Sequence, residues 1–250
     1  MKTLAVIIAR AGSKGLANKS MQPLAGRAVI EWTLEHALGC KRVDQVVLSS
    51  DCPQIRALGR DYGVTSYPRP ADRATDTAMI DDGARHGVEC WEAEHDTNCD
   101  HVAILYGNVP LRPPDLTDRA VAKLIETGAD SVQSVYPVGK MHPYWMKQLA
   151  GPAGDQLQMY QPNSVYRRQD LPPVYMLDGG VIAVRRQCLF TVVEGEPHAF
   201  LGKDRRGIVT EPGQVVDVDS ELDLAIAEVL LAKAGGHHRL TQLKRRRAAG

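Results

Sequence analysis

LAVIIARAGSKGLANK, residues 4–19, joins a short apolar run to a loop that is rich in glycine and cations. The run 4–9 contains only aliphatic side chains, which is typical of a β-strand buried on both faces. Gly12 and Gly15 follow this run, and glycine allows a backbone to turn sharply and to approach a ligand closely. The sequence therefore predicts a buried strand that ends in a ligand-binding loop.

The cations of this loop indicate which ligand it binds. Arg10, Lys14 and Lys19 are donors suited to phosphate oxygens, and successive loop N–H groups can form an anion-binding concavity. The chain has neither the G-x-x-x-x-G-K-[ST] pattern of P-loops nor the G-x-G-x-x-G pattern of dinucleotide-binding loops. We interpret the loop as a triphosphate site of another kind.

Strand-like and helix-like segments alternate along the rest of the chain. Apolar runs predict further strands at 46–48, 102–105, 131–138, 180–184 and around 215–218. Periodic patterns predict helices at 28–38, 53–62, 77–91, 115–126 and 221–232, and Asp51 is expected to cap the second of them. Such alternation is typical of a mainly parallel sheet covered by helices on both faces, with ligands bound where the strands end.

The composition is that of an ordinary globular protein. The chain has 250 residues, 44% hydrophobic and 24% charged, with a formal net charge of zero, so its bulk charge does not point to nucleic acid. Five scattered cysteines without a C-x-x-C pair argue against a disulfide or zinc framework and favour a cytoplasmic setting. No apolar stretch predicts a signal peptide or a membrane span, so we expect no membrane partner.

One segment interrupts the alternation of strands and helices. Residues 139–173 are rich in Pro, Gln, Tyr and Arg and have no helical period, so we expect an extended excursion or a dimerisation arm. The arm would be an insertion in a single domain that covers residues 1–234. Residues 235–250 are polar and basic, and we expect them to form a disordered tail.

A pair of carboxylates near the C-terminus is a candidate metal site. Asp217 and Asp219 are two residues apart at the end of an apolar run, so in an extended segment their side chains point the same way. Carboxylate oxygens at a strand end suit Mg²⁺ bound together with substrate phosphates. The alternative is that Asp219 or Ser220 caps the following helix and that Asp217 is solvated.

The N-terminal motif also resembles that of a known family. The acylneuraminate cytidylyltransferases, or CMP-sialic acid synthetases, carry R-x-G-S-K-G-x-x-x-K after the first strand, where it holds the phosphates of CTP. The matching side chains and the adjoining backbone are Ala9, Arg10, Ala11, Gly12, Ser13, Lys14, Gly15 and Lys19. The segment VVDVDSELDL resembles the family's D-I-D-T-E-x-D-L, whose aspartates bind the catalytic metal. The resemblance implies catalytic roles for Arg10, Lys14, Lys19, Asp217 and Asp219, with Mg²⁺ on the two aspartates.

The same family suggests which residues contact the cytosine. RPADRATDTA, residues 69–78, resembles R-P-x-x-L-A-x-D-T-A, which approaches the base through its arginine and through backbone groups. Arg69 and Ala78 are therefore expected to bind the nucleotide. Ile80 stands where family members have a serine, so the preference for cytosine is less secure than nucleotide binding itself.

The expected acceptor residues depart from the family pattern. Tyr106 replaces the glutamine of L-Q-P-T-S-P-L-R, and Asn108 stands at a metal-binding aspartate of the related CMP-KDO synthetases. Residues 167–175, RRQDLPPVY, and 178–180, DGG, resemble the family segment R-R-Q-D-L-P-x-x-Y-x-x-N-G-A. The resemblance implies that Arg167 and Tyr175 bind the acceptor, together with Asp178, which stands where the family has asparagine. An added carboxylate beside an anionic sugar acid would be repulsive unless neutralised. These departures predict a reshaped acceptor pocket.

The resemblance implies a three-layer α/β/α fold of the nucleotide-diphospho-sugar transferase type, with a mainly parallel, mixed sheet and a small dimerisation arm. The expected reaction joins CTP to a nonulosonic, sialic-acid-like sugar acid and gives a CMP-sugar and pyrophosphate. We expect a cytoplasmic homodimer joined through residues 139–173. The alternatives are another acceptor, such as a KDO-like acid or a phosphonate, GTP as the nucleotide, or a nucleotide-binding regulatory protein without catalysis.

Overall fold

In the computed structural model, which describes residues 1–12, 15–74 and 79–233, the largest element is a seven-stranded sheet in the order β11-β7-β10-β6-β1-β4-β5. The strands are β1 (Thr3–Ala9), β4 (Gln45–Ser50), β5 (Thr65–Pro68), β6 (His101–Tyr106), β7 (Ser131–Pro137), β10 (Tyr175–Arg185) and β11 (Arg205–Val209). In this sheet β10 runs antiparallel to both of its neighbours, and the other pairs are parallel. The mixed, mainly parallel sheet predicted from the sequence is confirmed.

Strand β1 lies inside the sheet between β6 and β4 and is buried on both faces. Its side chains alternate between two hydrophobic clusters, with Leu4 and Val6 on one face and Ala5, Ile7 and Ala9 on the other. This explains why residues 4–9 form a continuous aliphatic run rather than an alternating one, since neither face of the strand meets water.

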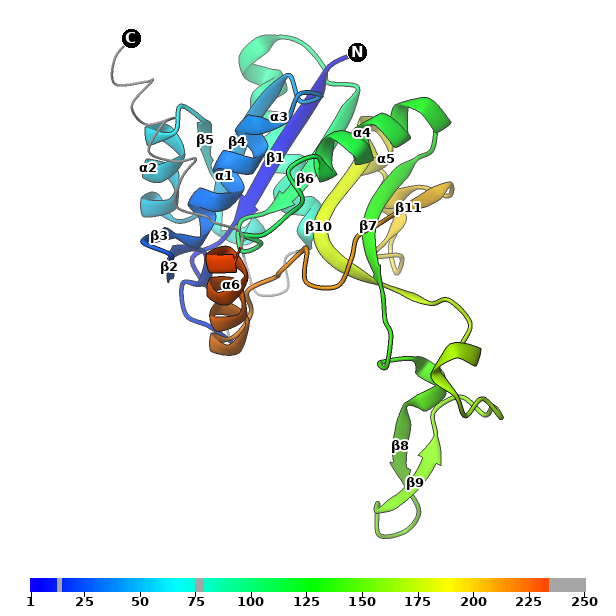
Figure 1. The fold of residues 1–250 in the computed structure, drawn as a ribbon. Coiled ribbons are helices and arrows are strands. Elements are labelled where there is room, and N and C mark those ends of the chain that lie inside the picture. The colour runs from blue at the N-terminus through cyan, green and yellow to red at the C-terminus, as the bar shows by residue number, and fades with distance from the viewer. Residues whose placement is uncertain (13–14, 75–78, 234–250) are drawn as a thin grey trace.

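Helices cover both faces of the sheet and form the outer layers (Figure 1). They are α1 (Val29–Gly39), α2 (Pro53–Asp61), α3 (Ile80–His95), α4 (Leu116–Thr127), α5 (Arg186–Leu189) and α6 (Glu221–Lys233). Residues of α1, α2 and α4 share one hydrophobic cluster, and those of α3 and α5 share the other. Helix α6 instead packs on the small hairpin β2 (Pro23–Leu24) and β3 (Arg27–Ala28). No helix in the described parts of the chain is long and apolar enough to cross a membrane.

Two strands of the large sheet were not predicted, and one predicted strand is wrong. Strands β5 and β11 are short and mostly exposed or half-buried, so they lack the aliphatic run that marks a buried strand. Residues 215–218 do not form a strand; Val216 makes an isolated bridge to Leu111. This segment lies beside the loop after β6 rather than along a strand, so no ladder of hydrogen bonds can form.

The start of one helix and the cap of another also differ from the sequence prediction. Helix α3 begins at Ile80 rather than Thr77, and its N-cap residue Met79 has an extended backbone. Helix α2 is preceded by Cys52 as the N-cap residue, without a side-chain cap, so the prediction that Asp51 caps it is wrong. The Asp51 carboxylate accepts a hydrogen bond from a different part of the chain, described below.

The segment between β7 and β10 forms the arm that projects from the sheet in Figure 1. It contains a hairpin of β8 (Lys147–Ala150) and β9 (Gln156–Met159), flanked by single turns of 3₁₀ helix at Pro143–Trp145 and Arg168–Asp170. Its large apolar side chains are exposed, notably Leu149 (67%), Leu157 (71%) and Tyr166 (91%). The extent of the domain, 1–234, stays a prediction, and the tail 235–250 lies outside the described residues.

Candidate active site

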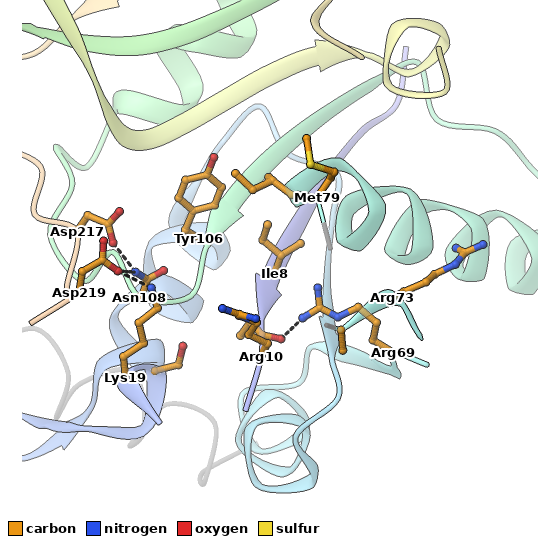
Figure 2. Close-up of a pocket in the computed structure, with 14 residues that line it drawn as sticks. Ile8, Arg10, Lys19, Arg69, Arg73, Met79, Tyr106, Asn108, Asp217 and Asp219 are labelled. Carbon is orange, nitrogen blue, oxygen red and sulfur yellow. Dashed lines mark hydrogen bonds and ion pairs between the residues drawn. The ribbon is translucent and has the colours of Figure 1, made fainter. Parts of the chain in front are cut away.

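A polar cleft opens where β1, β4 and β6 end (Figure 2). Its lining combines the first loop, the segment after β5, the start of α3, the turn after β6 and the aspartate pair. The lining residues are Ile8, Ala9, Arg10, Lys19, Ser20, Arg69, Arg73, Ala74, Met79, Ile80, Tyr106, Asn108, Asp217 and Asp219. Eight of the residues proposed from the sequence therefore surround one cleft: Ala9, Arg10, Lys19, Arg69, Tyr106, Asn108, Asp217 and Asp219.

Alternating burial aims the two aspartates into this cleft. Val216 and Val218 pack with α6 in a hydrophobic cluster, whereas Asp217 and Asp219 lie on the opposite side of the same segment. The backbone N–H of Val218 donates to the Asn108 carbonyl at 2.9 Å, which fixes the segment beside the turn after β6. The prediction of a shared direction holds although the segment is no strand, because an extended backbone has the same period of two.

The two carboxylates are close enough to influence each other. The Asn108 amide donates to Asp217 and also reaches Asp219 Oδ1 at 3.4 Å, and the Lys19 ammonium lies 2.5 Å from Asp219 Oδ1. Burial, and then the charge of Asp219, raise the pKa of Asp217 to about 6, while Lys19 and Arg112 act in the opposite direction. A second cation beside this pair would lower the cost of ionising Asp217.

Of the two residues that the alternative interpretation offered as a helix cap, Ser220 takes that role and Asp219 does not. The Ser220 hydroxyl accepts from the Asp223 N–H at 3.3 Å, while the Asp223 carboxylate accepts from the N–H groups of Ser220 at 2.9 Å and Asp219 at 3.2 Å. This reciprocal arrangement is that of a capping box at the start of α6. The Asp219 side chain is left directed at Lys19 and the cleft.

Two described residues of the first loop, Ala11 and Gly15, lie close to other parts of the chain. The Ala11 N–H donates to Asp51 Oδ1 at 2.9 Å, so this N–H faces β4 and is not directed at a ligand. A Cβ on Gly15 would lie 2.7 Å from the Asp219 carbonyl oxygen, so only glycine permits this approach of the loop to the aspartate segment. A Cβ on Gly12 would meet nothing within 4 Å. Ser13 and Lys14 lie outside the described residues.

Arg69 forms part of the opposite wall. Its guanidinium donates to the Ala9 carbonyl and packs against Gly83, where an added Cβ would lie 2.4 Å from Nη1. Burial lowers the pKa of Arg69, and the nearby Asp51 acts against this shift. Met79 and Ile80 add apolar surface beside it. Ala78 lies outside the described residues.

Tyr106 and Asn108 line the cleft from the turn after β6. Burial, and then the charge of Asp217, raise the pKa of Tyr106 to about 12, so the phenol is neutral at physiological pH. The ring is directed toward the space between the aspartate pair and Met79 (Figure 2). It can therefore offer one neutral hydroxyl to a ligand.

The remaining acceptor residues are not brought into this cleft by the single chain. Arg167 lies in the arm and pairs with Asp170 at 2.8 Å. Tyr175 is half-exposed at the start of β10, opposite Pro137 of β7. The Asp178 carboxylate is turned toward β7 and the end of β11 rather than the cleft, since its partners are Ser134, Gly180 and Thr210.

Two residues that hold this site in place were not among the site residues proposed from the sequence. Asp51 holds the first loop, although it had been expected to cap a helix. Arg112, whose pKa burial lowers to about 10, donates to the carbonyls of Tyr106 at 2.9 Å and Gly180 at 2.6 Å. Arg112 is the last residue of the motif Pro110-Leu111-Arg112, which matches the family pattern. The motif does not indicate that the Arg112 side chain donates to main-chain carbonyls.

The chain is an α/β protein with a polar cleft at the carboxyl ends of its parallel strands, and comparison with known proteins gives the family. Residues 4–190 match the model of the family described as cytidylyltransferase, so this chain belongs to the cytidylyltransferase family and is a nucleotidyltransferase. The expectation of a cytidylyltransferase is thereby confirmed.

Relatives and solved structures agree with this assignment. The chain is 28% identical to the CMP-N,N'-diacetyllegionaminic acid synthase of Legionella pneumophila, over 92% of this chain and 97% of the relative. It is 26% identical to the pseudaminic acid cytidylyltransferase of Campylobacter jejuni, over 92% and 96%. A CMP:2-keto-3-deoxy-manno-octonic acid synthetase solved with CTP superposes with a TM-score of 0.68 at 18% identity, covering 94% of this chain and 100% of that one. This last likeness concerns the fold.

Proposed function

We propose that this protein transfers the cytidylyl group of CTP to a nonulosonic, sialic-acid-like sugar acid and releases pyrophosphate. The proposal rests on the ion pair between Lys19 and Asp219, which are 200 positions apart in the sequence. The Lys19 Nζ lies 2.5 Å from Asp219 Oδ1. This ion pair joins a loop of cations and backbone N–H groups to a pair of carboxylates, the two parts that nucleotidyl transfer requires. The relatives whose names include legionaminic and pseudaminic acid suggest the acceptor class.

The reaction exchanges one phosphorus–oxygen bond for another. The anomeric hydroxyl oxygen of the sugar acid attacks the α-phosphorus, the bond from that phosphorus to the bridging oxygen breaks, and pyrophosphate leaves with the electron pair. The hydroxyl proton passes to solvent or to a basic group nearby. Arg10 and Lys19, with Lys14 expected beside them, would neutralise charge on the departing pyrophosphate.

The donor set of the cleft fits a magnesium ion. The carboxylates that line the cleft are those of Asp217 and Asp219, and the described residues contain no group of three or more His, Cys, Asp and Glu side chains that could hold a metal. Mg²⁺ is commonly bound by one or two carboxylates together with substrate phosphates. Burial and the charge of Asp219 raise the pKa of Asp217 to about 6, and a divalent cation bound by the pair would favour its ionised form. When bound, the ion would polarise phosphate and hydroxyl oxygens.

The cytosine would lie on the side of the cleft opposite the aspartates. Arg69 fixes this wall through Ala9, and Ile8, Met79 and Ile80 offer apolar surface for the face of a base. Main-chain groups at the start of α3 and the Arg69 guanidinium supply the polar contacts that a pyrimidine edge needs. Tyr106 and Asn108 lie between this wall and the aspartates, where the α-phosphate and the acceptor would meet.

A cytoplasmic homodimer is part of the proposal. Exposed Leu149, Leu157 and Tyr166 on the arm would form an unusual apolar surface in a monomer. A second copy seated on the arm would cover them and could bring Arg167 and Tyr175 to a cleft. The cysteines are free thiols, which suits a reducing compartment, and neither the fold nor the net charge of zero calls for a nucleic-acid or membrane partner.

The test is pyrophosphate release measured with each of four nucleoside triphosphates against a panel of legionaminic, pseudaminic, N-acetylneuraminic and KDO acids. We expect Mg²⁺-dependent release with CTP and at least one nonulosonic acid. Release with GTP, or with KDO alone, would reject the proposed substrates while keeping a nucleotidyltransferase. CTP binding without release in any combination would favour a regulatory protein.

A further inference from the structure

Strand β10 contains an irregularity at the edge of the candidate active site. Its pairing register with β7 shifts between Leu177 and Ile182, and within that stretch Gly179 has a φ of +72°. A residue in this left-handed region is strained unless it is glycine. The stretch 178–181, which lies opposite Ser134 alone, is therefore an irregular β-bulge, a feature that commonly re-aims side chains beside an active site.

The carboxylate of Asp178 accepts hydrogen bonds from three donors, which lie on β7, on β10 itself and just after β11. Asp178 Oδ1 accepts from the Ser134 hydroxyl of β7 and from the Gly180 N–H at 2.8 Å. Asp178 Oδ2 accepts from the hydroxyl of Thr210, just after β11, at 2.7 Å. Thr210 is only 2% exposed and Ser134 only 1%, so these donors are taken from the protein interior rather than from solvent. The carboxylate thereby fastens the bulge of β10 to β7 and β11.

The same bulge is held from its other side by Arg112. The Arg112 Nε donates to the Gly180 carbonyl at 2.6 Å, and its Nη2 donates to the Tyr106 carbonyl at 2.9 Å. The peptide groups of Gly180 are thus bonded at the N–H by Asp178 and at the carbonyl by Arg112. Asp178 and Arg112 together fix where the bulge lies relative to the turn after β6.

Gly179 faces two residues that line the cleft. A Cβ built on Gly179 would lie 3.4 Å from the Tyr106 ring and 3.5 Å from Asp217 Oδ2, which is ordinary van der Waals contact. Because glycine has no Cβ, the space between its backbone and these two side chains would just hold a methyl group. A shift of the bulge would narrow or widen this space beside the phenol ring and one carboxylate of the aspartate pair.

We propose that Asp178 is a positioning residue that holds the β10 bulge in its place beside Tyr106 and Asp217 and thereby shapes the acceptor side of the cleft without touching the acceptor. The proposal rests on the proposed function for what the cleft binds. It replaces the expectation that the Asp178 charge faces the sugar acid, because the carboxylate is turned toward its donors at β7, β10 and the end of β11.

The test compares variants that keep or remove the bonds of Asp178. Asp178→Asn keeps an oxygen for Ser134 and Gly180, and its amide can donate to the Thr210 hydroxyl. Asp178→Ala removes all three bonds, and Thr210→Val removes one bond through a residue outside the cleft. Thr65→Val, an exposed threonine of β5, is the matched control. For each variant, kcat/KM for the acceptor, CTP affinity by titration calorimetry and amide hydrogen exchange are measured.

Positioning predicts a graded pattern. Acceptor kcat/KM should fall at least about tenfold in Asp178→Ala and about threefold to tenfold in Thr210→Val, as expected for lost buried hydrogen bonds. Asp178→Asn and Thr65→Val should stay within about threefold of the wild type, and CTP affinity should change little throughout. A direct contact between Asp178 and the acceptor is indicated instead if Asp178→Asn changes the preferred acceptor while Thr210→Val is neutral, and this result would overturn the proposal.

Hydrogen exchange separates this proposal from the proposed function, because it requires no substrate. In Asp178→Ala we expect faster exchange not only in peptides covering 178–181 but also in those covering 106–109 and 216–219. Faster exchange confined to 178–181 would overturn the positioning role even in an active enzyme. If the wild type turned over no sugar acid, the proposed function would fail, and the exchange pattern would still decide on the role of Asp178.

Discussion

Removing the charge of Asp217 should stabilise the protein while abolishing its activity. The pKa of Asp217 is raised from 3.8 to about 6 by burial and by the charge of Asp219. Below pH 3.8 both the folded and the unfolded chain hold the proton, and the group has no effect. Between pH 3.8 and 6 the unfolded chain loses it first, so stability falls, and above pH 6 the folded chain carries the full cost of ionisation.

The size of this cost follows from the shift. A difference of about 2 pKa units corresponds to about 3 kcal/mol of folding free energy, and this net figure already includes the attraction of Asp217 to Lys19 and Arg112. The asparagine oxygen can still accept from the Asn108 amide. In a chain of this size about 3 kcal/mol raises Tm by roughly 6–12 °C.

The assay is thermal unfolding of wild type and Asp217→Asn in EDTA, from pH 4 to pH 8. We expect a Tm advantage for the variant at pH 7.5 that shrinks toward zero near pH 4. Added Mg²⁺ with CTP should stabilise the wild type more than the variant. A variant that is less stable at pH 7.5, or an advantage that does not depend on pH, would refute the electrostatic reasoning.

Three further predictions concern the loop, its packing and the arm. Asp51→Ala should weaken CTP binding by about fivefold to tenfold because the Ala11 N–H loses its acceptor, whereas Asp51→Asn should bind nearly as the wild type does; equal losses in both variants would mean that the charge matters instead. Gly15→Ala should lower kcat/KM for CTP by at least about tenfold, because its Cβ would lie 2.7 Å from the Asp219 carbonyl, and unchanged kinetics would show that the loop can shift freely. Analytical ultracentrifugation should find a dimer that Leu157→Glu weakens and that the control variant Glu126→Lys on α4 leaves unchanged. A wild type that stays monomeric at all concentrations would show that the arm does not join two copies.

The sequence predicted best where a residue's environment is set by its own neighbours. The aliphatic run 4–9 could only be a strand buried on both faces, and the alternation of Val216, Asp217, Val218 and Asp219 gave the direction of the carboxylates even though the predicted strand is absent. Strands β5 and β11 were missed because they are half-buried edge elements whose composition resembles that of a loop.

Roles that depend on partners far away in the sequence could not be predicted. Asp51 looked like a helix cap because Pro53 follows it, but its partner is the Ala11 N–H of another strand end. Asp178 looked like an added charge in a sugar pocket, and its three donors come from β7, from β10 itself and from the end of β11. Which donor pairs with which acceptor across the sheet depends on the fold. The pattern of neighbouring residues in the sequence does not contain this information.

The most direct test of the central claim is detection of the CMP-sugar itself, by mass spectrometry, from CTP, Mg²⁺ and a panel of nonulosonic acids. Wild type and Asp219→Ala are compared under identical conditions, with Thr65→Val as a folded control. The account predicts CMP-sugar and pyrophosphate in equal amounts from the wild type and at least about a hundredfold less from Asp219→Ala, as the loss of a metal ligand implies. Absence of a CMP-sugar from the wild type, or undiminished product from Asp219→Ala, would contradict it.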